Sequence, residues 1–261
     1  MRTKNDDHRL IDGAHGAPCG DVICVLMLLC QAASAQQSMP SVDSIEEDRE
    51  ASWTYLVRLN KFEHQQSTRD SEAHAEWGGF VVLETDPHAL WLTSKGATTE
   101  GSTESAEVRL FYSYTIAPHI GVQLGWKRDI EPKPARDWLG FGLIGVLPFK
   151  IGADASLFVG ESDSLAARLE FAYVYWITNK LSLTPDIEAN FYQNAYPQTV
   201  VDSTSSDLDL GLRLRYWVTG SLAPYVGITW KGDFNKPGDT NENLREGSSD
   251  TRLLLGISAW F

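Results

Sequence analysis

Two histidines near the start of the main part of the chain are the residues best suited to coordination chemistry. His64 and His74 lie at equal distances in sequence from Arg69, which we expect at the tip of a hairpin. With that antiparallel register the two imidazoles oppose each other on neighbouring strands. Glu63 and Glu72 are near enough in sequence to add carboxylate oxygens, and such a donor set suits Cu(II) or Zn(II). The spacing therefore predicts a metal site at these histidines and glutamates; a surface histidine pair without a metal is the alternative.

A second set of chemistry-bearing residues is charged and recurs at every second position of several stretches. Its members are Arg58, Glu107, Arg109, Lys127, Asp129, Asp154, Arg168, Glu170, Asp186, Glu188, Asp207, Asp209, Arg213, Arg215 and Arg252. Charges enclosed in a protein normally pair, so we expect ion pairs between Asp186 or Glu188 and the arginines of adjacent stretches. The alternative is a polar path or a cation-binding surface.

Motifs for enzymatic chemistry are absent from the sequence. No H-E-x-x-H sequence occurs, and no Ser/His/Asp grouping has motif support. Residues 140–145 match G-x-G-x-x-G, but Pro148 closes the segment and no helix follows. We therefore expect that the chain is not an enzyme. A hydrolase on a barrel scaffold is a weaker hypothesis, because it needs a nucleophile and base that are not visible.

Strands must position these residues, because apolar and polar side chains alternate. In residues 207–218 the even positions are apolar from Leu208 to Val218, whereas the odd positions include Asp207 and Arg213. Such alternation predicts one apolar and one polar face for each strand. Twelve alternating stretches are expected, at 53–64, 74–84, 89–97, 104–116, 119–130, 137–148, 150–160, 164–178, 181–193, 207–219, 222–233 and 250–261.

The connections between these stretches are short on one side and mostly long on the other, a pattern typical of outer-membrane barrels. Residues 220–221 are a short connection, whereas 194–206 and 234–249 are long ones. The final stretch ends on Phe261, an aromatic suited to a lipid–water interface. We therefore predict an all-β fold: a closed antiparallel transmembrane β-barrel of about 12 strands over residues 53–261. A soluble β-sandwich is the alternative, because its core would also select one apolar face.

The residues before the barrel have a different composition. Residues 22–30 form a short apolar run followed by small residues, which predicts a signal peptide at 1–35 with an atypically extended start and cleavage after Ala35. A lipoprotein lipidated at Cys30 is the alternative. Residues 36–52 are polar and aperiodic, so we expect a disordered periplasmic tail. The formal charge of −13 argues against nucleic acid as a partner.

Several segments resemble one protein family in order and spacing. They are residues 106–110 (AEVRL), 211–216 (GLRLRY), 223–227 (APYVG) with Trp230, and 249–252 (SDTR) with Gly256 and the terminal Trp260-Phe261. From about Trp53 to Phe261 the chain resembles the copper resistance protein B family of outer-membrane proteins. The resemblance implies a Gram-negative outer-membrane barrel in contact with lipid. It also implies copper as the bound ion and periplasmic copper-handling proteins as partners.

One departure from that family concerns its ligands. Members commonly carry a Met/His-rich stretch before the barrel, whereas residues 36–52 here contain Met39 and no histidine. Thioether and imidazole groups are good copper ligands, so we expect at most moderate copper binding, centred on His64 and His74. The leading hypothesis is copper resistance by binding, sequestering or exporting copper ions. The alternative is a passive outer-membrane pore or a structural barrel without a metal role.

Overall fold

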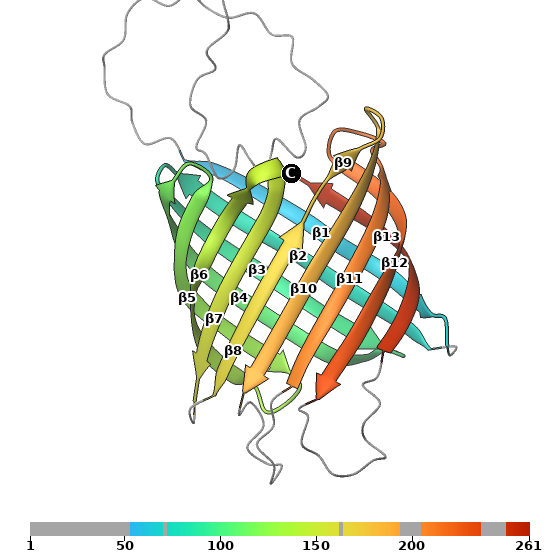
Figure 1. Cartoon of the computed structure of the whole chain (residues 1–261), viewed down its shortest axis with the longest axis horizontal. Helices are drawn as coiled ribbons and strands as arrows, with labels where there is room; N and C mark the ends of the chain where they lie inside the picture. Colours follow the sequence, from blue (N-terminus) through green and yellow to red (C-terminus); the bar gives the residue numbers. More distant parts are fainter. Residues whose placement is uncertain (1–52, 70–71, 162–163, 194–204, 236–248) are drawn as a thin grey trace, which may run out of the picture.

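Alternating strands build a closed antiparallel β-barrel, which confirms the predicted fold class (Figure 1). The computed structural model describes residues 53–69, 72–161, 164–193, 205–235 and 249–261; the predicted signal peptide and tail lie outside them. The strands are β1 (Thr54–Ser67), β2 (Ala73–Thr85), β3 (His88–Thr99), β4 (Ser102–Ala117), β5 (Ile120–Glu131), β6 (Arg136–Leu147), β7 (Ile151–Gly160), β8 (Leu165–Ala172), β9 (Tyr175–Trp176), β10 (Leu181–Gln193), β11 (Ser205–Tyr216), β12 (Leu222–Asn235) and β13 (Ser249–Trp260). A short 3-10 helix, Pro148–Lys150, joins β6 to β7.

The thirteen segments occupy twelve places around the barrel, because β8 and β9 lie along the same side of β10. The interruption between them faces Pro185 of β10. The Tyr173 amide donates to the Pro185 carbonyl at 3.1 Å. Proline has no N–H to return the second hydrogen bond of an antiparallel pair, so the ladder is incomplete at this point.

The first and last strands close the barrel by pairing with each other. Val57 N donates to the Phe261 carbonyl at 3.1 Å, and Phe261 N donates to the Val57 carbonyl at 2.9 Å. The C-terminus and the start of β1 therefore lie at the same end as the connections at 86–87, 118–119 and 148–150 (Figure 1). We call this the turn end, and the opposite end the loop end.

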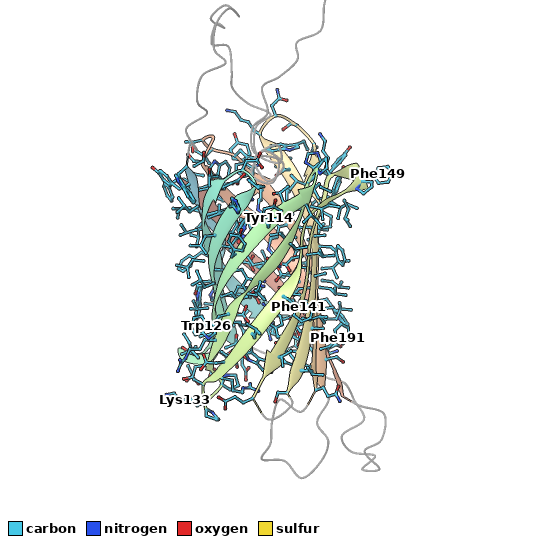
Figure 2. The ribbon with its side chains drawn as sticks, turned by 90° about the vertical axis from the view of Figure 1, so that its left-hand side faces the viewer. Tyr114, Trp126, Lys133, Phe141, Phe149 and Phe191 are labelled. Atoms are coloured by element: carbon cyan, nitrogen blue, oxygen red, sulfur yellow. The ribbon has the colours of Figure 1, made fainter. Side chains whose placement is uncertain are left out.

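The outer face of the barrel is apolar around its circumference. Leu212 is 40% exposed and Leu255 is 62% exposed, although both lie within strands. Aromatic side chains concentrate toward the two ends: Tyr114 and Phe149 lie toward the turn end and Trp126 toward the loop end (Figure 2). An apolar belt between two aromatic rows is the outer surface of an outer-membrane barrel. Among the described residues, no helix is long and apolar enough to cross a membrane.

A β-bulge in β1 changes which positions face the lumen along that strand. The register moves by one residue between Leu59 and Lys61, so Asn60 is an additional residue in β1. Before the bulge the even-numbered Leu56 is enclosed, and after it the odd-numbered Glu63 is enclosed. The inward face of β1 therefore cannot be followed through the strand by counting every second residue.

The lumen contains an apolar cluster as well as charges. Its enclosed members include Leu56, Val82, Trp91 and Phe111, and Phe80 packs against them. The Phe80 and Trp91 ring centroids are 5.3 Å apart. These side chains lie on the turn-end halves of β1 to β4, whereas Trp138 and Phe158 of the same cluster lie on the loop-end parts of β6 and β7, so the cluster follows one wall along the barrel.

Candidate functional site

Ion pairs cross the lumen near the middle of the barrel. Lys95 Nζ of β3 donates to Glu170 Oε1 of β8 at 2.6 Å and to Glu188 Oε2 of β10 at 3.1 Å. In the strand order β3 and β10 are six places apart in a ring of twelve, so this pair joins opposite walls. Direct contact across the full width shows that polar side chains meet in the centre of the lumen.

Arg168 of β8 is a second centre of these contacts. Its Nη1 and Nη2 atoms donate to the two carboxylate oxygens of Glu107 on β4 at 2.5 and 2.8 Å, and its Nε donates to Asn190 at 2.6 Å. Lys127 and Arg109 also approach Glu107, at 3.6 and 3.7 Å. Bidentate pairing of a guanidinium with a carboxylate fixes both side chains, so β4 and β8 are held at a set distance.

Glu63 and Arg213 form the most enclosed pair. The Glu63 side chain is 0% exposed, and Arg213 Nε donates to its Oε1 at 2.5 Å. Tyr225 and Gln65 donate to Glu63 at 2.9 Å each. Arg213 also pairs with Asp186. The carboxylate of Glu63 is thus fully occupied by its protein neighbours.

We refer to this set as the ion-pair network: Glu63, Lys95, Glu107, Arg109, Lys127, Arg168, Glu170, Asp186, Glu188 and Arg213. The expected cross-strand pairs are confirmed, because Asp186 pairs with Arg213 and Glu188 lies 3.5 Å from Arg168 Nε. Enclosed charges are tolerated when each has a partner, and the network meets that condition by joining residues from opposite walls.

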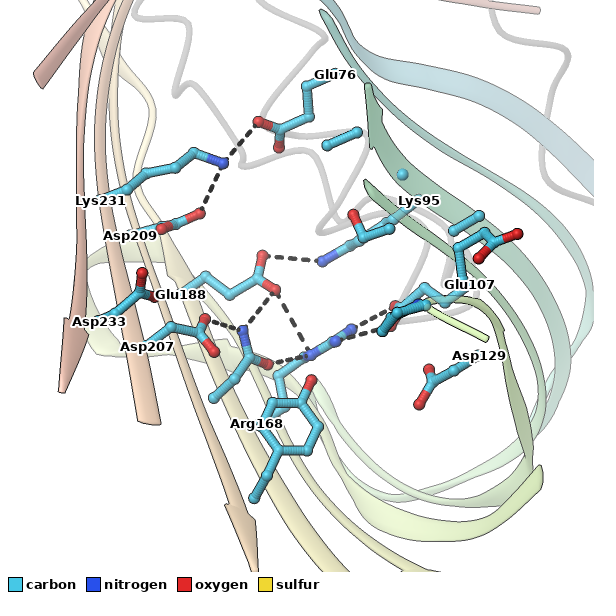
Figure 3. Close-up of a pocket in the computed structure, with 18 of the residues that line it drawn as sticks. Glu76, Lys95, Glu107, Asp129, Arg168, Glu188, Asp207, Asp209, Lys231 and Asp233 are labelled. Atoms are coloured by element: carbon cyan, nitrogen blue, oxygen red, sulfur yellow. Dashed lines mark hydrogen bonds and ion pairs between the residues drawn. The ribbon is translucent and has the colours of Figure 1, made fainter. Parts of the chain in front are cut away.

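An acidic cavity of about 460 Å³ lies on the loop-end side of the ion-pair network, and Lys95, Glu107, Arg168 and Glu188 of the network help to line it (Figure 3). We call it the vestibule. Its carboxylates are Glu76, Glu107, Asp129, Glu131, Glu188, Asp207, Asp209, Asp233 and Asp250, and its cations are Lys95, Arg136, Arg168, Lys231 and Arg252. Carboxylates therefore exceed cations by four. A concave surface with one sign in excess raises the local concentration of counter-ions, here cations.

Two of these carboxylates oppose each other directly. Asp207 of β11 and Asp233 of β12 are register partners that both line the vestibule. Asn190 donates to Asp207 at 2.8 Å, and within the described part of the chain no cationic group lies within 4.0 Å of Asp207. Both carboxylates add to the negative charge on this side of the vestibule.

The predicted opposition of His64 and His74 is wrong. The register pairs His64 with Ala75 and His74 with Gln65, so the two histidines are one step out of alignment. Because the bulge at Asn60 shifts the inward positions of β1 to odd numbers, His64 faces outward and is exposed, whereas His74 faces the lumen. The two imidazoles lie on opposite faces of the wall and do not converge.

The predicted carboxylate ligands are also separated. Glu63 lies in the ion-pair network, bound to Arg213, while Glu72 is exposed at the loop end. His74 Nδ1 lies 2.6 Å from the Thr99 hydroxyl of β3. Within the described ranges, no three His, Cys, Asp or Glu side chains are grouped closely enough to hold a metal ion.

The sequence pattern missed several lumen residues. Lys61, Glu76, Lys95 and Lys231 all take part in cross-lumen or cross-strand ion pairs but were not included in the expected charged face. Glu76, Lys95 and Lys231 keep the alternation of their own strands. Counting every second residue from an enclosed neighbour, such as Trp91 for Lys95, therefore places them in the lumen. Lys61 follows the bulge, and no simple period predicts its direction.

Comparisons with known proteins agree with this architecture. Residues 53–261 match the sequence model of a family described as copper resistance protein B precursor (CopB). The chain is 32% identical to a copper resistance protein B homolog of Pseudomonas syringae pv. tomato, covering 95% of this chain and 86% of that protein. It is also 32% identical to copper resistance protein B of Escherichia coli, covering 79% and 69%. Among solved structures, the NanC porin is similar with a TM-score of 0.50 at 14% identity, covering 79% of this chain and 99% of that one.

Proposed function

This chain belongs to the copper resistance protein B family, and we propose that it contributes to copper resistance from the outer membrane. In this proposal the barrel is not an enzyme. It is embedded in outer-membrane lipid and concentrates Cu(II) ions in the vestibule at its loop end. Periplasmic copper-handling proteins are its partners on the side of the turn end.

The excess of carboxylates in the vestibule is the observation that carries this proposal. Nine carboxylates and five cations share one cavity, and no described cationic group lies within 4.0 Å of Asp207. His74, at the same end, adds an imidazole, a ligand type that Cu(II) favours. Because these donors are spread around the wall, we expect weak, multiple binding rather than one tight chelate.

The ion-pair network supports retention of ions over free passage. Lys95 contacts Glu188 across the whole width of the lumen. A solute that enters the vestibule therefore meets ion-paired side chains that cross its path before it reaches the turn end. This arrangement disfavours the alternative of a wide passive pore. If the chain is instead a structural barrel without a metal role, it should bind no copper, and its deletion should leave the copper tolerance of the cell unchanged.

The cellular test is copper tolerance of a deletion strain that carries either this chain or an empty vector. We expect the chain to restore growth at copper concentrations that inhibit the empty-vector strain, and a variant with Asp207→Asn and His74→Ala to restore less. Equal growth with and without the chain would refute a copper role and favour the structural barrel.

The biochemical test is Cu(II) titration of the refolded barrel, followed by electron paramagnetic resonance. His64→Ala is the matched control for His74→Ala, because the two histidines lie near the same end but on opposite faces of the wall. We expect the nitrogen signal of bound Cu(II) to be lost in His74→Ala and kept in His64→Ala. If both variants bind Cu(II) like the original chain, His74 has no part in the site.

A further inference from the structure

Two arginines lie inside the barrel on the other side of the ion-pair network. Arg58 is on the turn-end part of β1, and Arg215 lies one residue before the end of β11. Both take lumen-facing positions, since Leu56 and Arg213 are enclosed two residues away on the same faces. Their side chains are partly exposed, so both remain accessible to water.

These arginines lack the carboxylate partners that other lumen cations have. Lys95, Arg168 and Arg213 each contact a carboxylate within 4.0 Å, whereas neither Arg58 nor Arg215 does so within the residues that the structure describes. The Nε atoms of both are buried without a hydrogen-bond partner. A buried donor without a partner is costly, so these positions are unfavourable as they stand.

Aromatic rings hold the two guanidinium groups in place. Arg215 Cζ lies 5.0 Å from the centre of the Tyr225 ring, and Arg58 Cζ lies 5.9 Å from that of Trp260. The ring centroids of Trp260 and Trp217 are 4.4 Å apart, and Trp217 follows Arg215 on the same face. Cation–π contacts stabilise a guanidinium and leave the N–H groups, which lie in the plane of the guanidinium itself, free to donate hydrogen bonds.

The surrounding carboxylates are engaged elsewhere. Asp186 and Glu63 are bound by Arg213. Glu84 lies at the turn end of β2, beyond the enclosed Leu56 and Val82 that separate it from Arg58 along the wall. Asp186 acts on Arg215 as Arg58 and Arg213 do, but it is already held by Arg213. Among the described residues, the guanidinium groups of Arg58 and Arg215 therefore have no carboxylate of their own.

We propose that Arg58 and Arg215 form a binding site for a small carboxylate or phosphate anion at the turn end of the lumen. A guanidinium presents paired N–H donors that match the oxygens of either group. On the neighbouring β10, Thr184 is the register partner of Arg213, two residues from Arg215, and its hydroxyl is buried without a partner among the described residues. The barrel thus has two different ends: an acidic vestibule that attracts cations and an arginine site that binds an oxyanion. The anion site goes beyond the proposed copper function and needs no copper.

The test is isothermal titration of the refolded, copper-free barrel at low salt with citrate and, separately, with phosphate. We expect saturable binding of at least one anion, weakened about 10-fold or more by Arg58→Gln and by Arg215→Gln through loss of charge-assisted hydrogen bonds. Arg128→Gln is the matched control, because Arg128 lies outside the lumen and pairs with Asp137 there. It should bind like the original chain.

The anion that binds more tightly identifies the physiological class, carboxylate or phosphate. The proposal is overturned if the folded original chain binds neither anion, or if both lumen variants bind as well as the control. Heat-modifiable migration on gels verifies that each variant is folded. Because copper is absent, failure here leaves the vestibule proposal unaffected.

Discussion

The carboxylate of Glu63 shows how a single enclosed charge is stabilised in this barrel. Three neighbours donate to it, and Arg213 is the charged one. Removing the charge of one member of an enclosed pair leaves the other without compensation, whereas an exposed pair contributes little.

We therefore expect Glu63→Gln to lower the free energy of unfolding by about 3–5 kcal/mol. Asp137→Asn is its control, because Asp137 and Arg128 are each 47% exposed, and its cost should be about 0–1 kcal/mol. Urea unfolding of the refolded barrel, followed by tryptophan fluorescence, measures both. Equal costs would show that Arg213 is compensated by Asp186 alone.

Gly211 makes room for the Arg213–Asp186 pair. A Cβ atom there would overlap both side chains, whereas one at Gly152, which faces the same lumen, would have its nearest neighbour 3.6 Å away. Gly211→Ala should therefore destabilise the barrel by about 1–3 kcal/mol through overpacking. Gly152→Ala should change the unfolding midpoint little, and a midpoint for Gly211→Ala as high as this control would show that the pair can move aside.

At the scale of the strand, alternation predicted most of the barrel. The expected stretches coincide with the strands except at 164–178, which is divided into β8 and β9. The inward face of β11 is the predicted one, because this strand keeps a period of two. In β1 the extra residue Asn60 reverses the faces and separates His64 from His74. A bulge of this kind has no signature in composition or spacing. Long-range pairs such as Lys95 with Glu188 also escape prediction, because they depend on the width of the closed barrel.

The outward face of β11 allows a test of its contact with lipid. Leu212 lies in the middle of the strand, whereas Val218 lies just beyond its turn end. Leu212→Arg should cost about 2–4 kcal/mol of barrel stability in a bilayer, and Val218→Arg about 0–1 kcal/mol, because the cost of a charge depends on its depth. Folding titrations into lipid vesicles measure both. Similar costs at the two positions would contradict a membrane-spanning β11.

At the scale of the whole molecule, charge is arranged in layers along the axis of the barrel. Excess carboxylates lie at the loop end, paired charges in the middle, and two uncompensated arginines toward the turn end. The middle layer separates the other two, because its side chains join opposite walls.

Lys95 is the residue whose loss should open a path for ions through the middle layer. We expect Lys95→Ala to raise single-channel conductance in planar bilayers and to favour cations, since Glu170 and Glu188 lose a positive partner that crosses the lumen. Lys133→Ala is the control, because Lys133 is 79% exposed at the loop end. Unchanged conductance in Lys95→Ala would mean that the remaining pairs block the lumen by themselves.

The pairing of β1 with β13 also has a consequence for how the barrel assembles. Its hydrogen bonds include those between Val57 and Phe261, so the cylinder stays open along one side until β13 has paired with β1. Until then, both edges of the sheet expose unpaired backbone groups that can join to other chains. Assembly must therefore protect two free edges at once, and a chain that lacks β13 has an unsealed sheet instead of a smaller barrel, since β13 is the strand that joins β12 to β1.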